Sequence, residues 1–176
     1  RKSIPANAIL RYKYGMAVEE QSAGQRNKEP YNRFISMNFM ICRDAFLKVR
    51  FDETFHLGYE DTLFGMQLEQ AGVEILHIDN PVYHLVEENS EQFLMKIRRA
   101  VRNLDGHIEQ MHSHVKLLRW YACVKRLGMA PLVAFLFRQI EKRLVSNLTS
   151  RKPSLKLFAF YKLGYLCNFL SQKKPD

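Results

Sequence analysis

Two adjacent carboxylates, Glu60 and Asp61, are the residues of this sequence best suited by type to accept a proton. They stand where a helical pattern begins, and the partial positive charge at a helix N-terminus favours an ionised carboxyl group. Gly58 before them lets the backbone approach a ligand closely, and Tyr59 offers an aromatic face. The pair therefore predicts a general acid or base, although acidic residues at a helix start are also typical of simple capping.

A second group of chemically active side chains lies between His77 and His84, with Asp79 between them. Imidazole nitrogens and carboxylate oxygens can ligate a divalent cation. On a strand, His77 and Asp79 share one face because they are two positions apart. The alternative is a strand end with polar turn residues, in which His84 is a hydrogen-bonded structural histidine.

The elements that must position these residues alternate between strand-like and helical patterns up to about residue 105. Three apolar, β-rich segments predict strands: 34–41, 73–78 and 82–85. Periodicity and capping signals predict helices near 8–20, 44–49, 61–71 and 90–104, with a loop over 51–59. This order predicts an α/β fold.

The remaining chain differs in charge and in pattern. Residues 1–111 carry 14 Lys and Arg against 16 Asp and Glu, a net −2, whereas residues 112–176 carry 13 against 2, a net +11. Helical spacing dominates from residue 112 onward. We therefore predict two parts, an α/β body over 1–111 and a basic amphipathic helical extension over 112–176.

The composition narrows the class of protein. Apolar residues make up 47% of the 176 residues, which is ordinary for a globular chain. The longest apolar run, Met129 to Phe137, is far shorter than the roughly 20 residues that span a bilayer. Three cysteines without a CxxC pair favour reduced thiols and a cytoplasmic protein.

Taken in order, the motifs of the first part resemble the C-terminal half of family 2 inverting glycosyltransferases. That family has a Ser/Thr-x-Asn strand, an aromatic-Asp-Glu loop, a Gly-aromatic-Glu-Asp helix start and a later histidine. The corresponding residues here are Ser36-Met37-Asn38, Phe51-Asp52-Glu53, Gly58-Tyr59-Glu60-Asp61 and His84. The match covers about residues 8–105.

The resemblance implies a GT-A, Rossmann-like fold and transfer of a sugar, with inversion, from a nucleotide-sugar donor to a glycan or lipid-linked acceptor. It makes Asp61 the catalytic base, with Glu60 as orienter or alternative, and His84 a ligand of Mg²⁺ or Mn²⁺. It also implies substrate-binding roles for the following residues: Asn38, Asp52, Glu53, Gly58 and Tyr59.

The family's nucleotide-binding half and its Asp-x-Asp metal motif have no counterpart in this sequence. The resemblance therefore implies a fragment of a larger enzyme, with most of the donor site elsewhere. It does not extend to residues 112–176.

The competing prediction is a non-catalytic basic module that binds an anionic membrane surface or nucleic acid. No helix-turn-helix, zinc-finger or RNP signature supports nucleic acid. Trp120 and the aromatic cluster of Phe158, Phe160 and Tyr161 suit insertion into a membrane surface, which predicts a peripheral location at its inner face. A homo-oligomer and a solvated, packed tail are the remaining alternatives.

Overall fold

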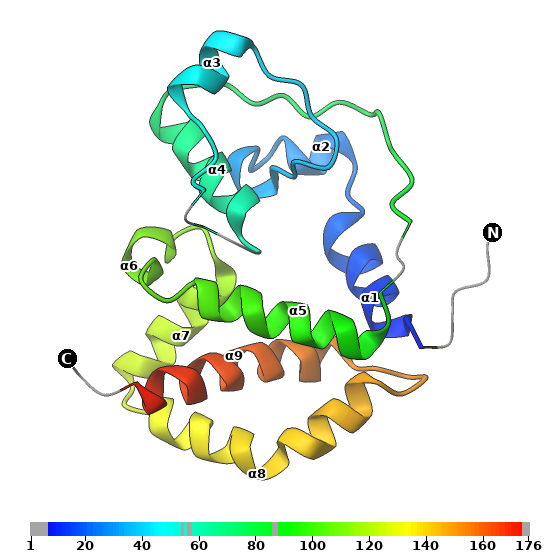
Figure 1. The fold of residues 1–176 in the computed structure, drawn as a ribbon, viewed down its shortest axis with the longest axis vertical. Helices are drawn as coiled ribbons and strands as arrows, with labels where there is room; N and C mark the ends of the chain where they lie inside the picture. The colour runs from blue at the N-terminus through cyan, green and yellow to red at the C-terminus, as the bar shows by residue number, and fades with distance from the viewer. Residues whose placement is uncertain (1–6, 54, 56–57, 86–87, 174–176) are drawn as a thin grey trace.

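Residues 7–53, 55, 58–85 and 88–173 are described by the computed structural model, and all regular secondary structure among them is helical (Figure 1). In chain order the elements are α1 (Ile9–Tyr14), the π-helical turn η1 (Gly15–Glu19), α2 (Ala23–Arg26), the 3₁₀ turn η2 (Tyr31–Arg33), α3 (Arg43–Lys48), α4 (Glu60–Gln70), α5 (Ser90–Asn103), α6 (Ile108–Met111), α7 (Lys116–Arg126), α8 (Ala130–Leu148) and α9 (Leu155–Gln172).

The α/β prediction, with its GT-A Rossmann-like portion, is wrong for the described part of the chain. None of the segments expected as strands, 34–41, 73–78 and 82–85, has strand structure. A strand exists only as part of a hydrogen-bonded ladder, and its sequence preference depends strongly on the neighbours it packs against. These segments find no ladder partner among the described residues, so their β-rich composition does not produce a sheet.

The segment after α4 runs as an extended chain across the outside of the molecule (Figure 1). Asn27 holds its middle, because its side chain donates to the His77 carbonyl and accepts from the His77 N–H, each at 2.8 Å. Asn38 donates to the carbonyl of Asn80 at 2.9 Å. Amide side chains thus satisfy main-chain groups that a neighbouring strand would satisfy in a sheet.

The predicted helices are present, and their ends follow the local sequence. Asn89 caps α5 by accepting from the Gln92 N–H at 2.9 Å, and the Gln92 side chain accepts from the Asn89 N–H in return. Gly72 follows α4 with φ +66°, a left-handed conformation that suits glycine. From residue 112 onward the described chain forms α7, α8 and α9, as the periodicity predicts.

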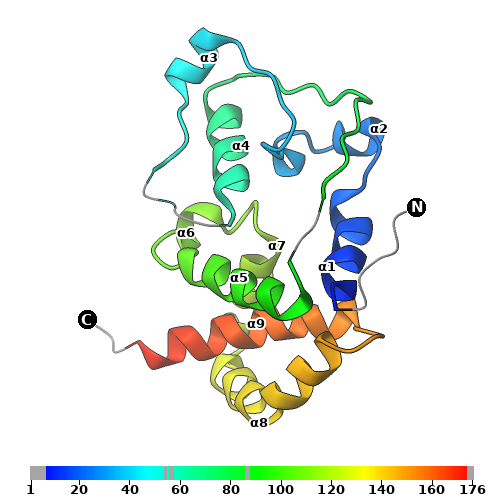
Figure 2. The ribbon, with the colours of Figure 1, turned by 45° about the vertical axis from the view of Figure 1, so that its right-hand side comes forward.

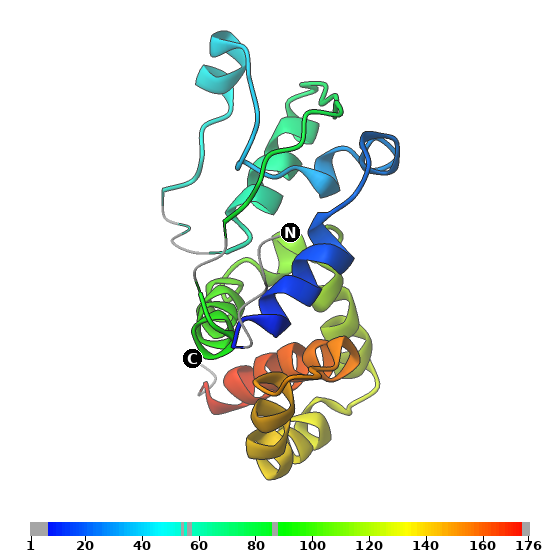
Figure 3. The ribbon, with the colours of Figure 1, turned by 90° about the vertical axis from the view of Figure 1, so that its right-hand side faces the viewer.

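The main hydrophobic core lies where α9 runs between α5 and α8 (Figures 1 and 2). It contains residues from Leu10 in α1 to Cys167 in α9, so one core joins helices on both sides of residue 111. Arg98 of α5 ties the layers together by donating to Glu141 of α8 at 2.7 Å and to the Tyr161 hydroxyl of α9. Helix α1 packs against both α5 and α9 (Figure 3).

A smaller core lies under the extended segments and α3. Its buried members are Phe34, Val49, Phe64 and Leu68. Helix α4 contributes residues to both cores. Leu63 and Met66 belong to the main core, and Phe64 and Leu68 belong to the smaller one. The helix that begins at Glu60 is therefore fixed from two sides.

Candidate functional site

The acidic pair occupies the first two positions of α4, and a left-handed turn places it there. Gly58 and Tyr59 have φ values of +76° and +72°. At Gly58 a Cβ atom would lie only 2.3 Å from the Cβ of Ala100 in α5, so a side chain cannot be accommodated. Gly58 is therefore needed where the turn crosses α5, which is a structural role beside the substrate contact that the resemblance implies.

Glu60 and Asp61 each keep one carboxylate oxygen buried without a hydrogen-bond partner among the described residues. These atoms are Oε2 of Glu60 and Oδ1 of Asp61, and Oε1 of Gln67 in the same helix shares this property. A buried acceptor without a donor costs about 1–3 kcal/mol, so such atoms are rare in stable folds. The arrangement presents proton acceptors at a helix N-terminus, which stabilises their negative charge.

Tyr59 faces the protein interior. Its ring packs against the main core. Burial, and to a smaller extent the nearby Tyr14, raises the pKa of its phenol well above the ordinary range. The phenol is therefore neutral at physiological pH. Its hydroxyl remains a donor for a hydrogen bond, and its ring supports the start of α4.

The other residues that the resemblance nominates lie on the two loops near α4. The Asn38 side chain is bonded to the carbonyl of Asn80, which joins the loop before α3 to the extended segment after α4. The main-chain carbonyl of Asp52 accepts from the Phe55 N–H at 3.1 Å. Glu53 is exposed.

His84 lies against a buried cation. Its Nδ1 is 3.4 Å from Nη2 of Arg11, whose guanidinium also pairs with Glu19 at 2.9 Å and Glu88 at 3.3 Å. A positive guanidinium beside Nδ1 disfavours a metal cation on that nitrogen. No group of three His, Cys, Asp or Glu residues within the described ranges is placed to hold a metal ion. The role of His84 as a ligand of Mg²⁺ or Mn²⁺, which the resemblance implies, stays a prediction.

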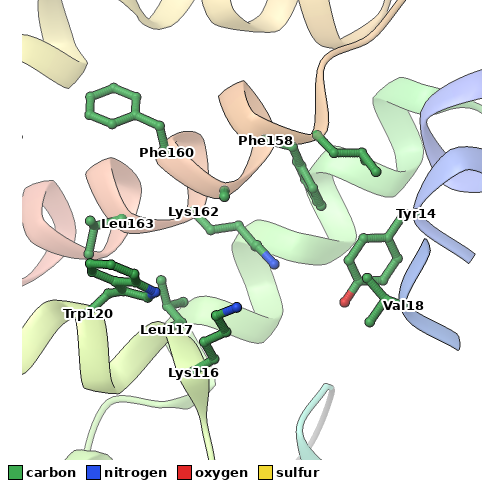
Figure 4. A pocket seen from close by; sticks show the side chains of 11 residues that line it. Tyr14, Val18, Lys116, Leu117, Trp120, Phe158, Phe160, Lys162 and Leu163 are labelled. Atoms are coloured by element: carbon green, nitrogen blue, oxygen red, sulfur yellow. The ribbon is translucent and has the colours of Figure 1, made fainter. Parts of the chain in front are cut away.

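A pocket of about 340 Å³ lies elsewhere, between the end of α1, η1, α7 and α9 (Figure 4). Lys116 of α7 and Lys162 of α9 point into it, and Tyr14 forms its opposite wall. The basic and aromatic character of this part of the chain is visible in the sequence. The pocket is not, because helical periodicity does not say which residues of two separate helices face one cavity.

The aromatic residues expected at a membrane surface separate into two groups. Phe158 and Tyr161 are fully buried in the main core, whereas Trp120 is 57% exposed. Within the described residues, no single helix has the length and apolarity of a membrane span. Helices α7 and α8 together meet both criteria but are bent by 115°.

Comparison of the chain with protein-family models, with curated proteins and with solved structures finds no match.

Proposed function

We propose that this chain provides the proton-accepting side of an inverting sugar-transfer reaction, with Asp61 as the general base. The observation that carries the proposal is the acidic pair at the start of α4, in which one carboxylate oxygen of each residue has no hydrogen-bond partner among the described residues. A base needs a carboxylate oxygen that is not already held by a protein donor, and a helix N-terminus is a favourable place for a carboxylate side chain. The ordered motifs from Asn38 to His84 give the reaction class.

In the proposed reaction, an acceptor hydroxyl donates a hydrogen bond to the Asp61 carboxylate. As the hydroxyl oxygen attacks the anomeric carbon, its proton passes to the Asp61 carboxylate. The bond between that carbon and the nucleoside diphosphate breaks on the opposite face, so the configuration inverts and the diphosphate carries away the electron pair. Glu60 orients the hydroxyl. Such base assistance contributes about 10²–10⁴ in rate.

The resemblance assigns donor binding to an Asp-x-Asp loop, and this sequence contains no such triplet. We therefore assign this chain only the acceptor side. The nucleotide-sugar contacts belong to residues outside the described site.

The test compares Asp61→Asn with Asp44→Asn in the full-length product of the gene. Both aspartates lie in the first turn of a helix, but Asp44 is exposed at the start of α3. Release of nucleoside diphosphate is followed over a panel of nucleotide sugars with acceptor present. We expect Asp61→Asn to lower turnover by about 10²-fold or more, with little change in donor affinity, and Asp44→Asn to leave it unchanged. Near-normal turnover of Asp61→Asn would remove the assignment.

A second candidate function, docking to an anionic membrane, is favoured by one surface feature. The corner between α7 and α8 exposes five apolar side chains: Leu127, Met129, Leu132, Phe135 and Leu136. Exposed basic residues stand on both sides of this corner, among them Arg126 and Arg138. An apolar patch with basic flanks is typical of surfaces that bind anionic lipid.

A further inference from the structure

The pocket beside α9 combines apolar walls with two ammonium groups. Figure 4 shows Lys162 and Lys116 pointing toward the same space from two helices. Leu117, Trp120 and Leu163 form an apolar side of the pocket. At about 340 Å³, the pocket is within the usual range for small-molecule sites.

No carboxylate among the described residues neutralises the two lysines. The described residues that line the pocket include no Asp or Glu. Glu19, the acidic residue nearest in sequence to the lining residues Tyr14 and Val18, is ion-paired with Arg11 at 2.9 Å. Within the described residues, neither Lys116 nor Lys162 forms an ion pair.

Lys162 is held in place by aromatic rings. Its Nζ lies 4.9 Å from the ring centroid of Phe158 and 5.3 Å from that of Tyr14. Burial, and then the neighbouring charge of Lys116, lowers the pKa of Lys162 to about 8. Ring faces attract the ammonium group but supply no negative charge, so its positive charge stays uncompensated.

The start of α7 adds positive potential on the same side. Lys116 is the first residue of this helix, whose first turn holds no acidic residue and whose N-cap residue, Val115, makes no side-chain cap. A cation at a helix N-terminus is unfavourable because the terminus already carries partial positive charge. A bound anion relieves this repulsion.

We propose that this pocket binds an amphipathic phosphate, with the phosphate between Lys116 and Lys162 and the apolar group against Leu117, Trp120 and Leu163. A phosphomonoester carries close to two negative charges near neutral pH, which matches the two ammonium groups. A carboxylate supplies only one. This inference does not rest on the sugar-transfer proposal, because it concerns binding in a different pocket.

Binding can be measured directly, because Trp120 is the only tryptophan of the chain and lines the pocket. Decyl phosphate is titrated below its micellar concentration while Trp120 fluorescence is recorded, with calorimetry as a second measurement. We expect saturable binding that Lys162→Met weakens about tenfold or more, and that Lys116→Met weakens severalfold. Lys156→Met in α9 and Lys125→Met in α7 are the matched controls, since both lysines are exposed and outside the pocket. They should bind decyl phosphate normally.

Further probes separate the contribution of the head group from that of the tail. Decyl maltoside should bind weakly and equally to wild type and Lys162→Met, whose fold is checked by circular dichroism. Weaker binding of inorganic phosphate than of decyl phosphate identifies an amphipathic ligand, while equal binding overturns the apolar half of the proposal. Decanoate binding as tight as decyl phosphate overturns the assignment to phosphate. Decyl phosphate binding that is unchanged by both lysine variants overturns the site itself.

Discussion

At the residue scale, the acidic pair and the buried arginine differ in how far neighbouring groups compensate their charges. Arg11 is 5% exposed, and its guanidinium is surrounded by Glu19, Glu88 and His84. Its neighbours supply the negative charge and acceptors that a buried cation needs. Glu60 and Asp61 each have one carboxylate oxygen without a hydrogen-bond partner in the described part of the chain. The difference marks Arg11 as part of the framework and the acidic pair as a site that can receive a donor.

This difference predicts opposite signs for two matched substitutions. Asp61→Asn removes the negative charge of a carboxylate whose buried Oδ1 has no hydrogen-bond partner among the described residues. The free energy of unfolding should therefore rise by about 1 kcal/mol, even though the favourable interaction between the charge and the helix dipole is lost. Asp44→Asn removes only a favourable charge at an exposed helix start, which should lower it by about 0.3–1 kcal/mol. Urea unfolding of the 176-residue chain measures both.

A clear loss of stability in Asp61→Asn would contradict this prediction. It would show that the Asp61 carboxylate stabilises α4 as an ordinary helix cap.

At the element scale, the two long helices α8 and α9 pack closely against each other. Gly164 of α9 lies against Phe137 of α8, and a Cβ atom at Gly164 would come within 2.6 Å of the ring. Phe137 is fully buried, so its ring has no free space to move into. The small residue at position 164 allows the two long helices to approach each other.

Gly164→Ala should therefore lower the free energy of unfolding by about 1–3 kcal/mol, even though alanine favours helix more than glycine does. Gly24→Ala is the matched control, because Gly24 is also helical and a Cβ there meets nothing within 4 Å. It should leave stability unchanged or raise it by up to about 1 kcal/mol. Thermal unfolding followed by circular dichroism compares the two. Equal effects would mean that the α8–α9 contact adjusts freely.

At the scale of the whole molecule, the helices of the basic segment contribute side chains to both the hydrophobic core and the surface. Helix α9 contributes buried residues to the core that α5 also lines, while the outer side of α8 exposes Leu132, Phe135 and Leu136. The buried positions of Phe158 and Tyr161 leave them unavailable for a membrane. The α7–α8 corner is therefore the part of the basic segment that we expect to contact lipid.

Vesicle co-sedimentation tests this docking mode. Binding to vesicles containing phosphatidylserine should weaken steeply with salt, and Phe135→Ser should weaken it about three- to tenfold, because the half-exposed ring loses its contact with lipid. Tyr83→Ser, at a fully exposed aromatic on the extended segment, should bind normally. No binding by the folded chain at low salt, or equal loss in both variants, would eliminate the α7–α8 corner as a membrane surface.

Features that depend on neighbours along the chain follow from the amino-acid sequence alone. Asn89 and Gln92 specify a capping box, Gly72 stops α4, and periodicity from residue 112 onward produces α7, α8 and α9. Each of these depends on hydrogen bonds or turns within a few residues. The start of a helix at Glu60-Asp61 follows for the same reason.

Contacts between residues far apart in the sequence depend on the tertiary packing. The segments expected as strands, 34–41, 73–78 and 82–85, have no ladder partner among the described residues, and Asn27 and Asn38 instead bond the chain at His77 and Asn80. Orphaned oxygens at Glu60 and Asp61, the guanidinium beside His84 and the convergence of Lys116 and Lys162 on one pocket depend on contacts between remote segments. Local periodicity sets which face of a helix is apolar, whereas burial, pairing and cavity shape depend on the other elements that pack against that face.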